Sequence, residues 1–189
     1  MKSKKITESN INDSIFNANS GEWWIEDGAF KALHSFNLIR TKFLSDAIES
    51  YSNKKLKKTR ILDVGCGGGI FCEPLARLGA DVTGIDTNKK AIQSAKFHAK
   101  SGNLNIKYLN TNLASMNDAN KFDIITCMEV LEHVDDVNFF IKKSSDKHKP
   151  CLVIPLQVYQ AMLYHQPPLC QYKFKMILSA ITTMEKRLS

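Results

Sequence analysis

The residues with the clearest chemical potential form a glycine-rich stretch, Asp63-Val64-Gly65-Cys66-Gly67-Gly68-Gly69. It directly follows an apolar run and precedes a segment with a helical pattern. Glycines permit a tight turn and let the backbone approach a ligand with no Cβ in the way. The first turn of a helix adds free N–H groups. In an open α/β sheet, ligands bind beyond the carboxyl ends of the strands. The stretch therefore predicts a ligand-binding loop at such an end.

A second acidic residue indicates the class of ligand. Asp86 ends the next apolar run, 21 residues after Gly65. A carboxylate there can accept both hydroxyls of a ribose. A dinucleotide fingerprint, G-x-G-x-x-G, would need a third glycine where Ile70 stands, whereas acid-x-G-x-G-x-G fits from Asp63 through Gly69. We predict a nucleoside ligand on Asp86, with Asp63 orienting the loop or another part of the ligand. The alternatives are a dinucleotide and a tight turn without a ligand.

A third group with chemical potential follows a later apolar run. Glu129, Glu132 and His133 stand at positions i, i+3 and i+4, so in a helical turn they share one face. Two carboxylates and an imidazole suit a divalent cation, with oxygen ligands favouring Mg²⁺ and the imidazole also suiting Zn²⁺ or Mn²⁺. Two alternatives stay open: His133 as a general base without metal, and acids that only favour a helix N-terminus.

Alternating strands and helices must position these groups. Strand and helix patterns alternate after residue 60, which predicts parallel βαβ units and a doubly wound α/β sheet. Before them, apolar residues recur at helical spacing over residues 21–51, which predicts helices packed on the main domain. The expected strands are residues 60–64, 81–86, 106–109, 122–127 and 151–154, and the expected helices are residues 70–78, 88–100 and 137–145.

Composition favours an ordinary globular domain. The chain has 189 residues, of which 43% are apolar and 24% charged, enough for one domain with a core. No apolar run reaches the ~18–20 residues of a membrane span, and the N-terminus lacks an apolar signal core, so we expect a cytoplasmic protein. The five Cys are widely spread, as reduced thiols are. The net charge of +7 includes a basic run at residues 54–60, but no interleaved aromatics accompany it, so we expect no nucleic-acid partner.

The loop, the acid after the second strand and the chain order resemble class I S-adenosylmethionine-dependent methyltransferases. Two further blocks resemble the ubiquinone-biosynthesis O-methyltransferase family. The first is Trp23-Trp24 followed by Gly28-x-Phe30-Lys31-x-Leu33-His34-x-x-Asn37-x-x-Arg40, and the second is Thr126-Cys127-Met128-Glu129-Val130-Leu131-Glu132-His133-Val134. The resemblance spans about residues 16–150.

The resemblance implies a set of cofactor contacts. Residues that match Arg40, Gly65, Asp86 and Met128 bind S-adenosylmethionine in that family. Arg40 would pair with the methionine carboxylate, the loop at Gly65 and Gly67 would approach the methionine part, Asp86 would take the ribose, and Met128 would touch the adenosine. The resemblance also implies Mg²⁺ at Glu129, Glu132 and His133.

The implied activity is transfer of a methyl group from S-adenosylmethionine to a phenol or catechol hydroxyl of a polyprenylated ubiquinone precursor. The acceptor oxygen must lose its proton, which gives Glu129 and His133 catalytic roles, since a cation they hold would stabilise the phenolate. Because the acceptor is membrane-bound, the resemblance implies peripheral contact with the inner membrane surface and with other ubiquinone-biosynthesis enzymes. The alternatives are a methyltransferase with another small acceptor and an inactive cofactor-binding relic.

Three segments are expected along the chain: a loose arm at 1–20, the methyltransferase domain at 21–150 and a departing tail at 151–189. The family continues with a glycine pair after a Lys-Pro, where this chain has Cys151. The family uses about seven strands and five at most are visible, so we expect an incomplete sheet and favour a truncated tail over a divergent ending. Trp23 and Trp24 are expected to form a lid or a core anchor, and His98 to lie at the surface.

Overall fold

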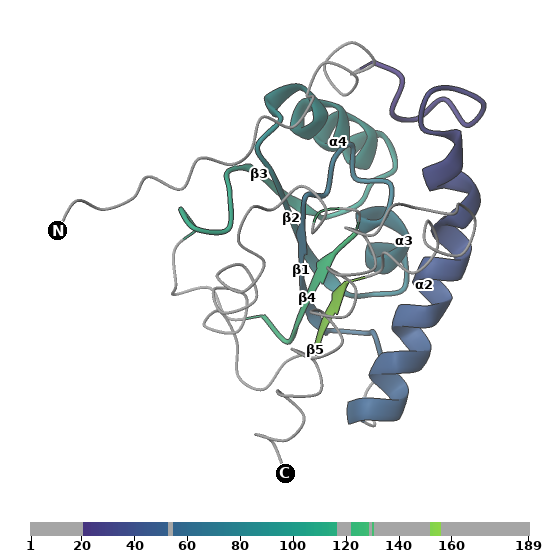
Figure 1. The fold of residues 1–189 in the computed structure, drawn as a ribbon, viewed down its shortest axis with the longest axis vertical. Helices are drawn as coiled ribbons and strands as arrows, with labels where there is room; N and C mark the ends of the chain where they lie inside the picture. The colour runs from purple at the N-terminus through teal and green to yellow at the C-terminus, as the bar shows by residue number, and fades with distance from the viewer. Residues whose placement is uncertain (1–20, 53–54, 117–121, 129, 131–151, 156–189) are drawn as a thin grey trace, which may run out of the picture.

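The computed structural model describes residues 21–52, 55–116, 122–128, 130 and 152–155. It contains a long N-terminal helix followed by strands and helices in alternation (Figure 1). In chain order the elements are α2 (Lys31–Ser52), β1 (Arg60–Val64), α3 (Cys72–Arg77), β2 (Asp81–Asp86), α4 (Lys89–Ser101), β3 (Lys107–Asn110), β4 (Ile124–Cys127) and β5 (Leu152–Pro155).

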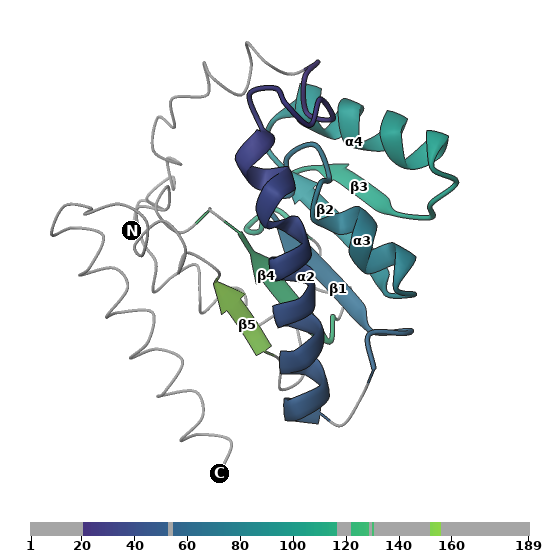
Figure 2. The same cartoon turned by 90° about the vertical axis from the view of Figure 1, so that its right-hand side faces the viewer.

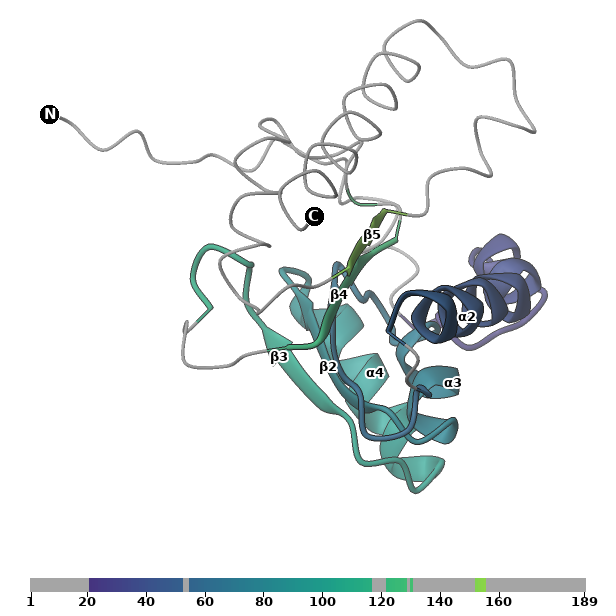
Figure 3. The ribbon, with the colours of Figure 1, turned by 90° about the horizontal axis from the view of Figure 1, so that it is seen from below.

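The strands form one parallel sheet in the order β3-β2-β1-β4-β5. Helices α2, α3 and α4 lie on the same face of this sheet (Figures 2 and 3). The strand order reverses at β1, so the crevice beyond its carboxyl end is the position where open α/β sheets bind ligands. The predicted α/β class with a Rossmann-like sheet and an N-terminal helix is confirmed.

The central strands form where the sequence has continuous apolar runs. In β1 every residue after Arg60 is buried, and in β2 the four residues before Asp86 are buried. Parallel strands covered on both faces have this pattern. Ile61, Leu62 and Ile125 have no exposed surface, and these side chains anchor the sheet at the strands that carry the candidate site.

Helix boundaries follow local signals closely in α4 and less so in α3. The Asn88 side chain accepts hydrogen bonds from the backbone N–H of Lys90 and Ala91, as an N-cap does, and Gly102 ends α4. The expected helix over 70–78 is shorter, because turns of the glycine loop continue to residue 71. Pro74 stands in the first turn of α3, where its missing N–H removes no helical hydrogen bond.

Residues 21–30 form turns, so the helical expectation for 21–51 holds only from Lys31 onward. The expected arm at 1–20, the helix at 137–145 and the tail beyond residue 155 lie outside the described residues. Among the helices that the structure does describe, none combines the length and the apolar character needed to cross a membrane.

Candidate cofactor site

The glycine loop leaves β1 and folds against the end of β2. The N–H groups of Gly65 and Cys66 both donate to the carbonyl of Ile85, at 2.8 and 3.0 Å. Gly65 and Gly67 have φ of 71° and 53°, in the left-handed region where other residues are strained. The sequence places glycines here because the chain must turn sharply beside a neighbouring strand.

Asp86 connects the end of β2 to this loop. Its Oδ2 accepts a hydrogen bond from the Gly67 N–H at 2.8 Å, and its Oδ1 accepts one from the Asn88 N–H at 2.7 Å. The side chain is half-buried. The two features that indicated a nucleoside ligand in the sequence are therefore in direct contact, at the carboxyl end of adjacent strands.

Asp63 lies beneath the loop in a fully enclosed position, with 2% of its surface exposed. The Thr126 hydroxyl on β4 donates to its Oδ1 at 2.7 Å, and the Cys72 thiol donates to its Oδ2 at 3.2 Å. Burial raises the pKa of Asp63 from 3.8 to about 6, although these two hydrogen bonds act in the opposite direction. Asp63 thus connects β1, β4 and α3 under the loop.

Arg40 brings a positive charge to this cluster of carboxylates. It lies on α2 with 9% of its surface exposed, and its charge lowers the pKa of Asp63 while that of Asp86 raises it. The structure therefore brings together Arg40, Asp63 and Asp86 from three different elements. A buried cation beside two carboxylates and a glycine loop can bind a ligand that carries both charges and hydroxyl groups.

Met128 is buried directly after β4, with 8% of its surface exposed. Two residues later, Val130 packs against the glycine loop so closely that a Cβ on Gly65 would overlap its Cγ2 methyl. The segment after β4 therefore approaches the loop from the β4 side, and the contact of Met128 with adenosine stays a prediction.

The predicted metal ligands Glu129, Glu132 and His133 lie outside the described residues. Within the part of the chain that the structure describes, no three His, Cys, Asp or Glu side chains form a group suited to a metal ion. The Mg²⁺ site stays a prediction.

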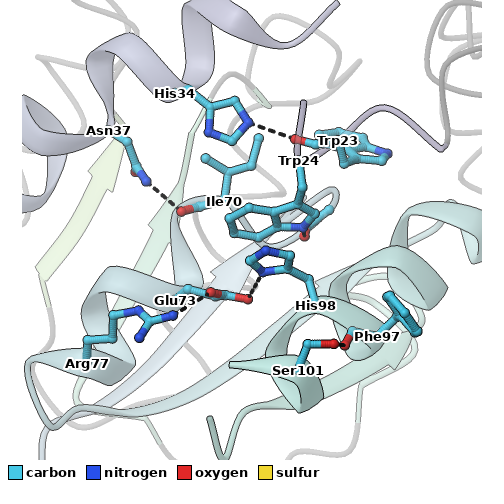
Figure 4. Close-up of polar contacts among 11 residues, drawn as sticks. Trp23, Trp24, His34, Asn37, Ile70, Glu73, Arg77, Phe97, His98 and Ser101 are labelled. Carbon is cyan, nitrogen blue, oxygen red and sulfur yellow. Dashed lines mark hydrogen bonds and ion pairs between the residues drawn. The ribbon is translucent and has the colours of Figure 1, made fainter. Parts of the chain in front are cut away.

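The N-terminal segment, which comprises the turns at 21–30 and helix α2, contacts the glycine loop (Figure 4). We had predicted no such contacts from the sequence. Trp24 Nε1 donates to the Gly68 carbonyl at 3.0 Å, and Asn37 Nδ2 donates to the Ile70 carbonyl at 2.6 Å. The ring of Trp23 lies directly over the loop, where a Cβ on Gly68 would overlap it. Trp23 is buried and stacks on Phe30, so it is a core anchor that also covers the loop.

His98, which we expected at the surface, is half-buried and has specific partners. Its ring stacks on Trp24 with centroids 3.5 Å apart, and its Nδ1 lies 2.7 Å from Oε1 of the buried Glu73. His34, to which no role was assigned, has its Nε2 2.8 Å from the carbonyl of Trp23. The sequence pattern does not indicate these contacts, although Trp24 and His34 both belong to the N-terminal signature.

A family model described as a methyltransferase domain matches residues 34–174. The chain belongs to the methyltransferase domain family.

The ubiquinone biosynthesis O-methyltransferase of Pelagibacter ubique (strain HTCC1062) is 49% identical over 129 residues, which cover 66% of this methyltransferase chain and 54% of that protein. The enzyme of that name from Mesorhizobium japonicum is 41% identical over 142 residues, which cover 71% and 57% of the two chains. The resemblance seen in the sequence is confirmed.

A solved structure agrees on the fold. The plantazolicin methyltransferase BpumL, in complex with a monoazolic desmethylPZN analog and SAH, matches with a TM-score of 0.56 at 17% identity. The match covers 76% of this methyltransferase chain and 58% of that one. The chain spans about half the length of the curated relatives it matches.

Proposed function

We propose that this methyltransferase chain binds S-adenosylmethionine at the glycine loop and transfers its methyl group to a phenol or catechol hydroxyl of a polyprenylated ubiquinone precursor. The observation that carries the proposal is the contact between the Asp86 carboxylate and the Gly67 N–H at the carboxyl end of β2. The acceptor class is supported by the 49% identity to a ubiquinone biosynthesis O-methyltransferase.

The residues of the site fit the chemical groups of S-adenosylmethionine. The Asp86 carboxylate, which the backbone N–H groups of Gly67 and Asn88 orient, is the acceptor that we assign to the ribose hydroxyls. Arg40 offers a planar guanidinium for the methionine carboxylate. Gly65 and Gly67 have positive φ, which gives the loop the sharp turn that we assign to the approach of its backbone to the methionine part.

In the proposed reaction the cofactor supplies an electrophilic methyl group on a sulfonium. The protein residues bind and orient: Asp86 holds the nucleoside and Arg40 the amino-acid end, so the methyl group has a fixed direction. Asp63 joins β1 to β4 through Thr126 and to α3 through Cys72, beneath the loop. Met128, buried directly after β4, is assigned to apolar contact with the adenosine side.

The acceptor side of the proposal rests on Glu129, Glu132 and His133. We assign them to a Mg²⁺ ion, which would stabilise the phenolate form of the acceptor, and we assign the catalytic roles to Glu129 and His133. The support is the chemistry of two carboxylates and an imidazole at helical spacing, together with the resemblance. A polyprenyl acceptor further implies that the protein works in the cytoplasm at the inner membrane surface, in peripheral contact with lipid or with other enzymes of the same pathway.

The decisive experiment incubates purified protein with methyl-labelled S-adenosylmethionine and a polyprenyl catechol. We expect labelled methyl ether, and we expect its formation to collapse with a chelator or in Glu129→Ala. Unchanged rates under both conditions would remove the metal from the mechanism. Cofactor binding by calorimetry without any product would instead favour a relic that binds the cofactor, and product from an unprenylated acceptor alone would favour a different substrate.

A further inference from the structure

The glycine loop needs support from outside its own sequence. Gly67, Gly68 and Gly69 follow one another, and consecutive glycines leave the backbone more freedom than any other residues do. Two carbonyls of the loop region receive hydrogen bonds from side chains of the N-terminal segment: Gly68 from Trp24 and Ile70 from Asn37. These bonds fix the orientation of peptide groups that the loop sequence leaves free.

Trp24 is itself held by a chain of contacts (Figure 4). The His98 ring stacks on it within 4° of parallel, which fixes the plane of the indole. Glu73 fixes His98 in turn, through the 2.7 Å contact of its Oε1 with Nδ1. Glu73 is 3% exposed, and its other oxygen lies 3.4 Å from Arg77, so the carboxylate has little room to move. The path Glu73–His98–Trp24 thus connects α3 and α4 to the Gly68 carbonyl.

Apolar burial alone does not account for this arrangement. Trp23 and Phe30 already cover the loop with their stacked rings, both buried. Trp24 is only half-buried, and what it adds is an N–H group aimed at the Gly68 carbonyl. His98 also differs from its neighbour Phe97, which is 75% exposed and takes no part in the contacts described for the loop.

We propose that Trp24 and His98 are positioning residues that hold the glycine loop in its cofactor-binding conformation before the cofactor arrives. The inference deepens the proposed function and rests on it for the identity of the ligand. A loop ordered in advance binds more tightly, because less conformational freedom is lost on binding. Loss of the Trp24 hydrogen bond is expected to weaken cofactor affinity about two- to tenfold, the range for one neutral hydrogen bond.

The test uses the full chain and Trp24→Phe, which keeps an aromatic ring against His98 and removes the donor. Hydrogen–deuterium exchange without ligand should rise at the amides of residues 65–70 and stay unchanged in β2 and β3. Saturating S-adenosylhomocysteine should return the loop exchange to the wild-type level, and its dissociation constant by calorimetry should rise about two- to tenfold. A merely structural loss would raise exchange across α4 and β3 and persist with ligand.

His98→Phe is the second variant, since it keeps a stacked ring and loses the contact with Glu73, and Phe97→Ala is the matched control on the same helix. We expect His98→Phe to change loop exchange in the same direction as Trp24→Phe, and Phe97→Ala to leave it unchanged. Loop exchange at the wild-type level in both Trp24→Phe and His98→Phe would overturn the inference. If the wild type does not bind S-adenosylhomocysteine, the proposed function fails, while exchange in the free chain still decides whether the two residues position the loop.

Discussion

Asp86 is the side chain on which the nucleoside assignment depends. Both of its oxygens accept backbone hydrogen bonds, one from the loop and one from the start of α4. A charged acceptor fixed in this way needs no reorganisation to receive a ribose diol. Its position at the end of β2 would place a bound ribose next to the loop rather than deeper in the sheet.

Replacement of this carboxylate should abolish most of the cofactor affinity. Asp86→Ala removes the charged acceptor for the ribose and releases the Gly67 N–H, so we expect S-adenosylhomocysteine to bind at least about tenfold more weakly. Calorimetry measures the effect. Asp81→Ala is the control, because Asp81 is exposed at the opposite end of the same strand. Equal losses of affinity in the two variants would contradict the assignment.

Asp63 makes a separate prediction about stability and pH. Burial raises its pKa from 3.8 to about 6, so between these pH values the folded state keeps a proton that the unfolded chain has released. The contribution of Asp63 to the free energy of unfolding is therefore largest below about pH 4 and falls by up to about 3 kcal/mol as pH rises through 6.

Asp63→Asn should remove this dependence. Urea unfolding of both proteins from pH 4 to 7 gives the difference in unfolding free energy, in which other titrating groups cancel. We expect the wild type to lose stability relative to the variant across that interval. A difference that stays constant with pH would show that Asp63 does not keep its proton in the folded state.

At the scale of elements, the N-terminal segment and the glycine loop form one packed unit. The Trp23 ring lies on the loop, where a Cβ on Gly68 would overlap it, and Gly68 has no positive φ that would add backbone strain. The cost of a larger residue at position 68 is therefore steric and comes from one identified neighbour.

Gly68→Ala should lower the free energy of unfolding by about 1–3 kcal/mol, the usual cost of overpacking. Gly21→Ala is the matched control, because nothing lies within 4 Å of a Cβ at Gly21. The double variant Gly68→Ala/Trp23→Ala has no clash. Its loss of unfolding free energy should therefore be smaller than the sum of the losses in the two single variants. Denaturant unfolding of the four variants measures this coupling, and strict additivity would show that Trp23 does not restrict Gly68.

The strands could be predicted from the sequence because each central one is a buried apolar run bounded by polar or turn residues. β1 and β2 have the predicted bounds, and β3 is displaced by one residue, as Ile106 precedes it. The shortened α3 has a physical reason: a loop that turns back on β2 needs residues that a helix would otherwise take. Such a demand comes from tertiary structure and is absent from helical periodicity.

The site was predictable where one motif carries it and not where distant segments meet. Asp86 and Gly67, which are joined by a hydrogen bond, are 19 residues apart within one βαβ unit. Trp24 and Gly68 are 44 residues apart, and His98 looks like any polar residue on an amphipathic helix until its partners Trp24 and Glu73 are known. Pairing between side chains of different elements follows from packing, which sequence spacing does not encode.

At the scale of the whole molecule, the proposed ligand would connect elements that are distant in sequence. Arg40 on α2 and Asp86 on β2 both act electrostatically on Asp63 of β1, so a ligand bound between them would stabilise their mutual arrangement. A molecule that binds only the folded chain raises its stability by mass action, by about 2.7 kcal/mol at 100 times the dissociation constant. Ligand identity can therefore be determined from thermal unfolding without an acceptor substrate.

S-adenosylhomocysteine at that concentration should raise the melting temperature by about 5–10 °C for a chain of this size. NAD⁺ at the same concentration should leave it unchanged, because the third glycine of a dinucleotide fingerprint is replaced by Ile70, which is buried beside Trp23 and Phe30. Asp86→Ala with S-adenosylhomocysteine should show a much smaller shift, since the ribose acceptor is gone. A shift with NAD⁺ and none with S-adenosylhomocysteine would show that the loop binds dinucleotides. Asp86 would then bind the adenosine ribose of a dinucleotide, and the protein would belong to a different class of reaction.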